Sequence, residues 1–239
     1  TNEPDTIHLR YLMDEKKYKP SSCDMFMRNI IILDKDGTVL DTMNATLEGF
    51  VKTMRPYSTR EQVIEIIKRT NGKSTDEQYA SMLNRPQDDP LVLGLVEDLW
   101  GILKKIKPEP FEDALEVVPR LANDGYTLVM STGYRQDIAE AQLKMVGLGK
   151  YFDLILGHNP PVIKGKPHME AIRKHYELSV EEMKEVVIVG DGPGDMQMGQ
   201  GYTPRLYGID RLGNSQELVE AGAIEIFPDL REFYNHFSK

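Results

Sequence analysis

Two carboxylates separated by one residue directly follow the apolar run 30–33. They are Asp34 and Asp36, and Gly37 comes next. Side chains two residues apart at a strand end leave the strand on the same side, and a glycine lets the backbone approach a ligand closely. One carboxylate of such a pair can attack phosphorus as a nucleophile while the other moves protons. The alternative is a plain turn, since Asp-Gly is a common turn pair.

A second acidic segment, residues 190–195, contains Asp191 and Asp195 within a turn rich in glycine and proline. Hard divalent cations such as Mg²⁺ prefer oxygen ligands of this kind. The segment does not fit a dinucleotide-binding loop, because the third glycine of that motif would fall on Asp195. A Gly/Pro turn with solvated carboxylates is the alternative interpretation.

Two further segments could bind an anion. Residues 131–135 combine hydroxyl side chains with backbone N–H groups at the expected start of a helix, which together form an anion site. The alternative there is a simple helix N-cap by Ser131 or Thr132. Lys166 precedes Pro167, a residue type that suits the first turn of a helix, and a lysine at that place can offset phosphate charge. Its alternative is a solvated loop lysine.

The elements that must position these residues alternate between strands and helices. Continuous apolar runs with β-branched residues, bounded by polar residues, predict strands buried in a parallel sheet. Strands and helices in such alternation form right-handed βαβ units, whose ligands bind at the carboxyl ends of the strands. We expect strands at 30–33, 127–131, 152–156, 186–189, about 205–209 and 223–227, and helices at 112–123, 135–146, 167–176, about 215–221 and the C-terminus.

Residues 42–107 lack a buried-strand pattern and contain helix signals in series. Capping boxes begin at Ser58 and Ser74, another is predicted at Ser179 farther along, and Asp89 precedes a helix with a leucine-rich face. Because the helical block follows the first strand and precedes all others, we predict an α/β fold in which a Rossmann-like parallel sheet carries an inserted all-helical cap. The predicted organisation is an N-terminal extension at 1–27, a core at 28–41 and 108–239, and a cap at 42–107.

The four segments in this order resemble the haloacid dehalogenase (HAD) superfamily. The motifs are hhhhDxDGT at 30–38, hhhSTG ending at 133, Lys-Pro at 166–167 and hhhhGDxxxD ending at 195, where h is hydrophobic. The first and last are specific, and the other two are weak alone. The resemblance covers about residues 28–230, and the helical insert is similar to the small cap of the phosphoglycolate phosphatase and β-phosphoglucomutase branch.

The resemblance implies a role for each motif residue. Asp34 would be the nucleophile that forms an aspartyl-phosphate, and Asp36 would protonate the leaving oxygen and then activate water. Thr132 and Gly133 would contact the phosphoryl oxygens, with Ser131 as the alternative hydroxyl.

The remaining implied roles concern charge and specificity. Lys166 would stabilise charge on the nucleophile and the phosphate, with Lys164 as its rival. Lys73 and Arg69 of the cap are the candidates for contacting the far end of the substrate, although most such charges are solvated helix-face residues. The implied Mg²⁺ ligands are Asp34, Asp36 through its backbone carbonyl, Asp191, and Asp195, which would bind through water or orient Lys166.

Two positions depart from the family pattern. Lys35 stands where the family more often has an apolar residue, and Gly133 stands where phosphatases often carry Asn. Asp36 is present, whereas the dehalogenases and the phosphonate-cleaving members of the superfamily lack an Asp there. The resemblance therefore favours chemistry on phosphate esters.

Composition restricts the partners. The chain has 239 residues, a net charge of −9 and one cysteine. An acidic chain is poorly suited to sequence-independent binding of nucleic acid or anionic membranes. A single cysteine excludes an intrachain disulfide and favours a reducing compartment such as the cytoplasm. No apolar run approaches the roughly 20 residues of a membrane-spanning helix.

The expected function is that of a Mg²⁺-dependent phosphatase acting on a small phosphorylated metabolite, of the phosphoglycolate or sugar phosphate class. The alternative within the same branch is a phosphomutase, which would depend on a sugar bisphosphate activator. A non-catalytic binding protein on this fold is the third hypothesis, and the presence of every expected catalytic residue weighs against it.

Overall fold

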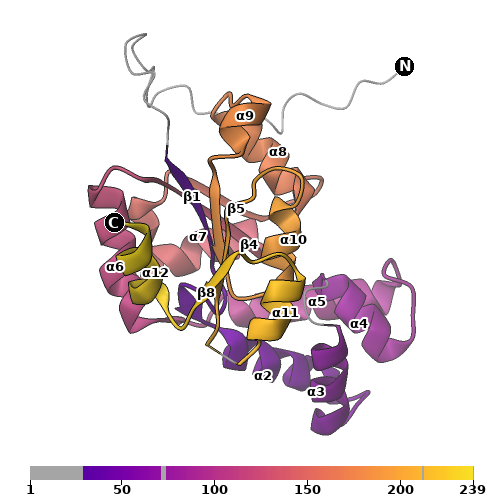
Figure 1. Ribbon diagram of the computed structural model, residues 1–239. Coiled ribbons are helices and arrows are strands. Elements are labelled where there is room, and N and C mark those ends of the chain that lie inside the picture. The colour runs from indigo at the N-terminus through magenta and orange to yellow at the C-terminus, as the bar shows by residue number, and fades with distance from the viewer. Residues whose placement is uncertain (1–28, 71–73, 212, 239) are drawn as a thin grey trace, which may run out of the picture.

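The computed structural model describes residues 29–70, 74–211 and 213–238. Within them, six strands form one parallel sheet in the order β5-β4-β1-β6-β7-β8, with helices on both faces (Figure 1). This architecture confirms the predicted α/β class with a Rossmann-like sheet. The strands of the sheet are β1 (Ile30–Asp34), β4 (Thr127–Arg135), β5 (Leu154–His158), β6 (Val187–Gly190), β7 (Leu206–Ile209) and β8 (Glu225–Phe227).

Strand β1 lies in the middle of the sheet and is fully buried. Its side chains alternate between two hydrophobic clusters: Ile31 and Leu33 face the cluster built on α6 and α12, whereas Ile30 and Ile32 face the cluster built on α8, α10 and α11. Burial on both faces explains why the strand is a continuous apolar run. The helices and one short 3-10 helix of this core are α6 (Glu112–Asn123), α7 (Gln136–Met145), η1 (Gly149–Tyr151), α8 (Lys166–His175), α9 (Val180–Met183), α10 (Pro193–Gly199), α11 (Ser215–Glu220) and α12 (Leu230–Phe237).

Four helices between the first and second strands of the large sheet pack into a third hydrophobic cluster. That cluster also takes in Tyr134 and Ile138 of the core, so the four helices rest on the sheet edge where the strands end (Figure 1). The chain crosses between the two parts through short strands that pair antiparallel, with Leu40 opposite Pro110. The elements are β2 (Leu40–Asp41), α2 (Met43–Met54), α3 (Arg60–Arg69), α4 (Thr75–Leu83), α5 (Pro90–Leu103) and β3 (Glu109–Pro110).

Most of the predicted helix starts are confirmed. Ser74 and Ser179 begin capping boxes, and the Asp89 side chain accepts a hydrogen bond from the first turn of α5. The box predicted at Ser58 is wrong by one residue, because Thr59 caps α3 and pairs with Gln62. Ser58 instead belongs to the turn that ends α2, where its N–H donates to Met54. Among the described helices, none combines the length and the apolar character that crossing a membrane requires.

Candidate functional site

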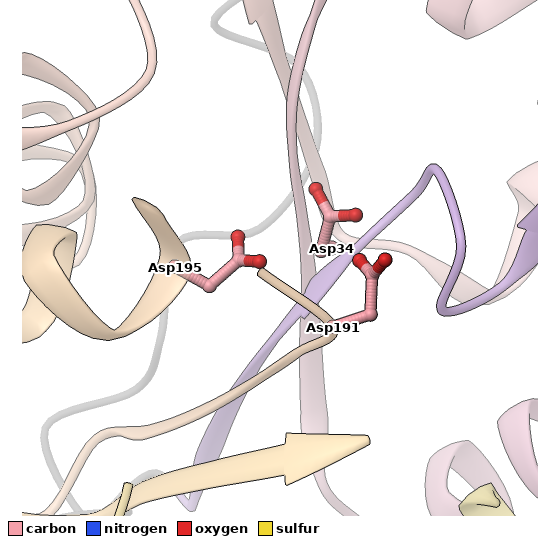
Figure 2. Close-up of side chains that lie close together, drawn as sticks. All are labelled: Asp34, Asp191 and Asp195. Atoms are coloured by element: carbon pink, nitrogen blue, oxygen red, sulfur yellow. The ribbon is translucent and has the colours of Figure 1, made fainter. Parts of the chain in front are cut away.

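Three buried or half-buried carboxylates converge at the carboxyl ends of β1 and β6. Asp34 ends β1, Asp191 follows β6, and Asp195 lies in the first turn of α10 (Figure 2). Each offers an oxygen within 4.8 Å of oxygens from the other two. Strands β1 and β6 are paired neighbours in parallel, so residues that follow them meet at one edge of the sheet. The structure thus brings together three of the four predicted metal-binding aspartates through their side chains.

Two glycines allow this close packing of carboxylates. Gly37 has a φ of +85°, and a Cβ at that position would lie 2.2 Å from Oδ2 of Asp191. A Cβ on Gly190 would lie 2.3 Å from Cγ of Asp195. Both distances are far inside van der Waals contact, so larger residues would displace the carboxylates. The glycines beside the acidic motifs are therefore required by the geometry of the cluster.

The lysine that contacts this cluster is Lys164, which corrects the expectation for Lys166. The Lys164 Nζ lies 2.5 Å from Oδ1 of Asp34 and 2.7 Å from Oδ1 of Asp195. Helix α8 begins at Lys166 with Pro167 in its first turn, and Gly165 precedes it with a φ of +119°. Lys164, the loop residue before Gly165, therefore faces Asp34. Lys166 lines the same cavity and forms no ion pair within the described residues.

The electrostatics of the cluster show an excess of negative charge. Burial raises the pKa of Asp34 well above its usual range, and Lys164 only partly opposes this effect. Burial and the nearby Asp195 raise the pKa of Asp191 to about 7. Although burial disfavours the charge of Lys164, Asp195 and Asp34 raise the pKa of that lysine above its ordinary value. One ammonium group among these carboxylates leaves room for a further cation.

An unsatisfied acceptor next to the carboxylates fits a hydrated cation. Asn214 Nδ2 donates to the backbone carbonyl of Asp191 at 2.8 Å, while Asn214 Oδ1 is buried and has no hydrogen-bond partner among the residues that the structure describes. Asn214 and all three carboxylates line one cavity. Mg²⁺ prefers oxygen ligands and usually keeps several bound waters. One of these waters would donate a hydrogen bond to Asn214 Oδ1. The donor set therefore fits Mg²⁺.

Asp36 lies beside the acidic cluster, and its side chain is held by three other residues. Its Oδ1 accepts hydrogen bonds from Lys35 Nζ and, at 2.5 Å, from the Thr42 hydroxyl. Its Oδ2 accepts from the Thr132 hydroxyl at 2.7 Å. The Asp36 side chain lies outside the group of carboxylates that could share a cation. It lines the cavity with Asp34, and the metal contact expected of its backbone carbonyl stays a prediction.

Strand β4 runs four residues beyond its predicted end at residue 131, so neither Ser131 nor Thr132 is the N-cap of the helix that follows, which was expected from residue 135. The chain stays extended through Thr132 and Gly133, with a register shift after Ser131, and α7 begins only at Gln136. Alternation along the strand sends the two neighbouring hydroxyls in opposite directions. Thr132 faces Asp36, whereas the Ser131 hydroxyl contacts Nδ1 of buried His168 at 2.8 Å.

His168 is a satisfied core residue. Burial lowers its pKa to about 4, so the ring is neutral near pH 7. Nε2 is 3.2 Å from the Gly157 carbonyl, which can only accept, so Nδ1 is left to accept from Ser131. Of the two hydroxyls, that of Thr132 points toward Asp36, but Thr132 is buried and does not line the cavity, so its contact with a phosphate stays a prediction.

The cavity in front of these residues has a volume of about 680 Å³. Besides the residues already named, Gly133 and His158 line it from the core, and Met43 and Ser74 line it from the helical block. Arg69 is exposed at the end of α3 and is not among the lining residues. Lys73 lies outside the described residues, as does the predicted N-terminal extension at 1–27.

Some residues of the site were not found by sequence reasoning. The Arg211 guanidinium donates to the carbonyls of Gly37 and Thr38, pairs with Asp113 at 2.6 Å, and so holds the loop after β1. Thr42 carries no motif signal of its own, and Asn214 begins a run, 214–223, that resembles the same branch without indicating a role in the site. Lys35 did carry a signal, because it departs from the apolar residue usual in the family, but two of its partners, Tyr134 and Gln142, lie far away in sequence.

A pair of lysine variants tests the corrected assignment. We expect Lys164→Met to lower kcat/KM for the substrate at least about a hundredfold, because it removes the cation that contacts Asp34. The matched change Lys166→Met should have less than about a tenth of that effect. Steady-state kinetics of both purified variants measures the difference. A larger loss in Lys166→Met would show that Lys166 is the lysine that contacts the phosphate.

The chain is similar in sequence to known hydrolases and phosphatases. The model of a family described as haloacid dehalogenase-like hydrolase matches residues 31–206. The protein named Probable phosphatase IndB, from Dickeya dadantii (strain 3937), is 27% identical over 205 residues, which cover 81% of this chain and 89% of the relative. Pyrophosphatase PpaX of Bacillus mycoides (strain KBAB4) is 24% identical over 200 residues, covering 81% and 88%.

A solved structure is similar in fold across nearly its whole length. A predicted phosphoglycolate phosphatase from Haemophilus somnus 129pt superposes with a TM-score of 0.69 at 14% identity. The match covers 89% of this chain and 99% of that one. At this identity the likeness concerns the fold alone.

Proposed function

Because the chain belongs to the haloacid dehalogenase-like hydrolase family and hydrolyses phosphate esters as a member of it, we propose that it is a Mg²⁺-dependent phosphatase of a small phosphorylated metabolite. The observation that carries this proposal is the position of Asp34. The Asp34 carboxylate contacts Lys164 and belongs to the cluster of three carboxylates that could hold a cation. It also lines the same cavity as Asp36. Nucleophile, cation site and proton-transfer group are thus within reach of one bound phosphate.

In the first step, an Asp34 carboxylate oxygen attacks phosphorus, and the bond from phosphorus to the ester oxygen breaks. Asp36, entering this step as the carboxylic acid, gives its proton to that leaving oxygen. The products of the step are an alcohol and an aspartyl-phosphate on Asp34. Lys164 faces the charge that develops at the nucleophile, and Thr132 and Gly133 are proposed to contact the phosphoryl oxygens.

In the second step, the Asp36 carboxylate takes a proton from a water molecule as the water oxygen attacks the phosphorus of the aspartyl-phosphate. The bond between phosphorus and Asp34 breaks, which releases phosphate and restores the Asp34 carboxylate. Asp36 ends the step protonated, ready for the next substrate. Each Asp therefore returns to its starting form over one cycle.

Mg²⁺ would be held by Asp34 and Asp191, with Asp195 and Asn214 around it, and it would offset the negative charge of the carboxylates and the phosphate. The helices α2 to α5 are proposed as a cap over the cavity that limits the entry of bulk water. Met43 and Ser74 are its described residues that line the cavity, so we assign part of substrate selection to the cap.

The substrate class is proposed as phosphoglycolate or a sugar phosphate, as the family branch suggests. Pyrophosphate joins the set because several relatives, among them the Bacillus mycoides protein, are named pyrophosphatase. The test is phosphate release with Mg²⁺ across a panel of these compounds, run beside Asp34→Asn. Release from one or a few of them, lost in the variant, is the expected result. No release from any compound by a folded protein, even with a sugar bisphosphate present, would contradict the proposal.

A further inference from the structure

Lys35 is a charged residue buried completely next to the proposed acid/base. Its side chain is 0% exposed, although lysine is rarely buried unless it is paired. It does not line the cavity, so it faces Asp36 from behind rather than from the substrate side. A buried ammonium group costs stability unless partners compensate it, so its position needs an explanation.

Three groups compensate the Lys35 charge. Its Nζ pairs with Oδ1 of Asp36 and donates to Oε1 of Gln142 at 3.0 Å. The same nitrogen lies 3.7 Å from the ring centroid of Tyr134, a distance at which the aromatic face attracts a cation. Gln142 and Tyr134 are themselves buried, so the lysine is held in one place.

Tyr134 and Gln142, the two neutral partners of Lys35, also contact residues of the helical block. The Tyr134 hydroxyl lies 2.5 Å from the Thr46 hydroxyl in α2, and Gln142 Nε2 donates to the Leu103 carbonyl, at the end of α5, at 3.3 Å. These contacts reach the first and the last helix of the block. The Lys35 ammonium group thus connects Asp36 with both ends of the proposed cap.

We propose that Lys35 is a positioning residue that holds the Asp36 carboxylate at the leaving-group side of the cavity and links that position to the placement of the cap. Lys35 provides a counter-charge for Asp36 outside the acidic cluster, which keeps the side chain of Asp36 from becoming a further ligand of the cation bound there. The inference rests on the proposed function, in which Asp36 protonates the leaving oxygen.

The test compares two leaving groups in Lys35→Met, which keeps an unbranched side chain of similar length and removes its charge. An alkoxide leaving group needs a proton, whereas p-nitrophenolate leaves without one. The parameter kcat/KM reports only binding and the first phosphoryl transfer when that transfer is irreversible. For an alkyl phosphate substrate, we expect kcat/KM to fall roughly 10- to 100-fold, because its leaving group needs the proton of Asp36. For p-nitrophenyl phosphate it should fall less than about threefold.

A second arm removes the group through which Lys35 acts. In an Asp36→Asn background, Lys35→Met should cause no further loss of kcat/KM, because the two changes act on one interaction. Equal losses for both leaving groups, no loss for either, or additive losses in the double variant would overturn the inference. Gln142→Met, which removes one partner of Lys35 without changing Asp36, should show a weaker form of the same selective loss.

The control is Lys104→Met. Lys104 pairs with Asp137 at 2.8 Å and also joins α5 to α7, but its side chain is 53% exposed and lies away from the cavity. This variant should leave both kcat/KM values unchanged, and thermal unfolding of all variants checks their fold. If the wild-type chain releases phosphate but Lys35→Met behaves like wild type, only the inference on Lys35 fails. If the wild-type chain releases none, the proposed function fails instead.

Discussion

Asp34→Asn is expected to lower the rate of phosphate release at least about a thousandfold, because the amide cannot form the aspartyl-phosphate. The remaining groups of the site stay in place, so substrate binding should persist. Phosphate release and substrate affinity, measured separately on the same preparation, distinguish loss of chemistry from loss of binding. A rate within about tenfold of wild type would show that Asp34 is not the nucleophile.

The same substitution should not unfold the protein. Burial raises the pKa of Asp34, which means that the metal-free fold disfavours the ionised carboxylate. A neutral Asn relieves the repulsion from Asp195 and Asp191 while it gives up the ion pair with Lys164. We therefore expect an equal or higher midpoint of thermal unfolding without metal. The matched control is Asp88→Asn, an exposed carboxylate in the helical block, which should change neither activity nor stability.

Removal of divalent cations with a chelator is expected to reduce phosphate release to the background level, and added Mg²⁺ should restore it. The physical reason is the acidic cluster, in which Asp34, Asp191 and Asp195 place oxygens within 4.8 Å of one another. A phosphate dianion would add to this repulsion, and Lys164 alone does not balance it. Full activity in the presence of excess chelator would contradict the proposed Mg²⁺ dependence.

Cation binding can also be measured without turnover. Mg²⁺ at about a hundred times its dissociation constant stabilises the fold by about 2.7 kcal/mol, which corresponds to roughly 5–10 °C in the unfolding midpoint of a chain of this size. We expect this shift in the wild-type chain and its loss in Asp191→Asn. Asp88→Asn should retain the shift, which separates a site-specific effect from a general response to Mg²⁺.

Local sequence properties determined the sheet and the positions of the acidic motifs. The run 30–33 is apolar at every position because β1 is buried on both faces, and such a pattern is independent of distant residues. Asp34 and Asp191 follow apolar strands that end at the same edge of a parallel sheet, so their convergence follows from the class of fold.

Element ends were predicted less well where local signals competed. Ser58 and Thr59 can both begin a capping box, and the turn after α2 decided in favour of Thr59. Strand β4 continues beyond residue 131 because it pairs with β5 again after a register shift, at Arg135 and His158. Neither the turn after α2 nor the second pairing of β4 with β5 can be predicted from the local residue pattern.

The sequence by itself determined the order of strands and helices along the chain and the two acidic motifs, because hydrophobic periodicity and motif spacing are properties of neighbouring residues. The tertiary structure alone decided which lysine meets Asp34 and which groups compensate Lys35. Lys164 and Lys166 differ by two positions, and the path of the loop before α8 decides between them. Besides the adjacent Asp36, the Lys35 charge is compensated by Gln142, more than a hundred residues away, because compensation of a buried charge depends on distance in space.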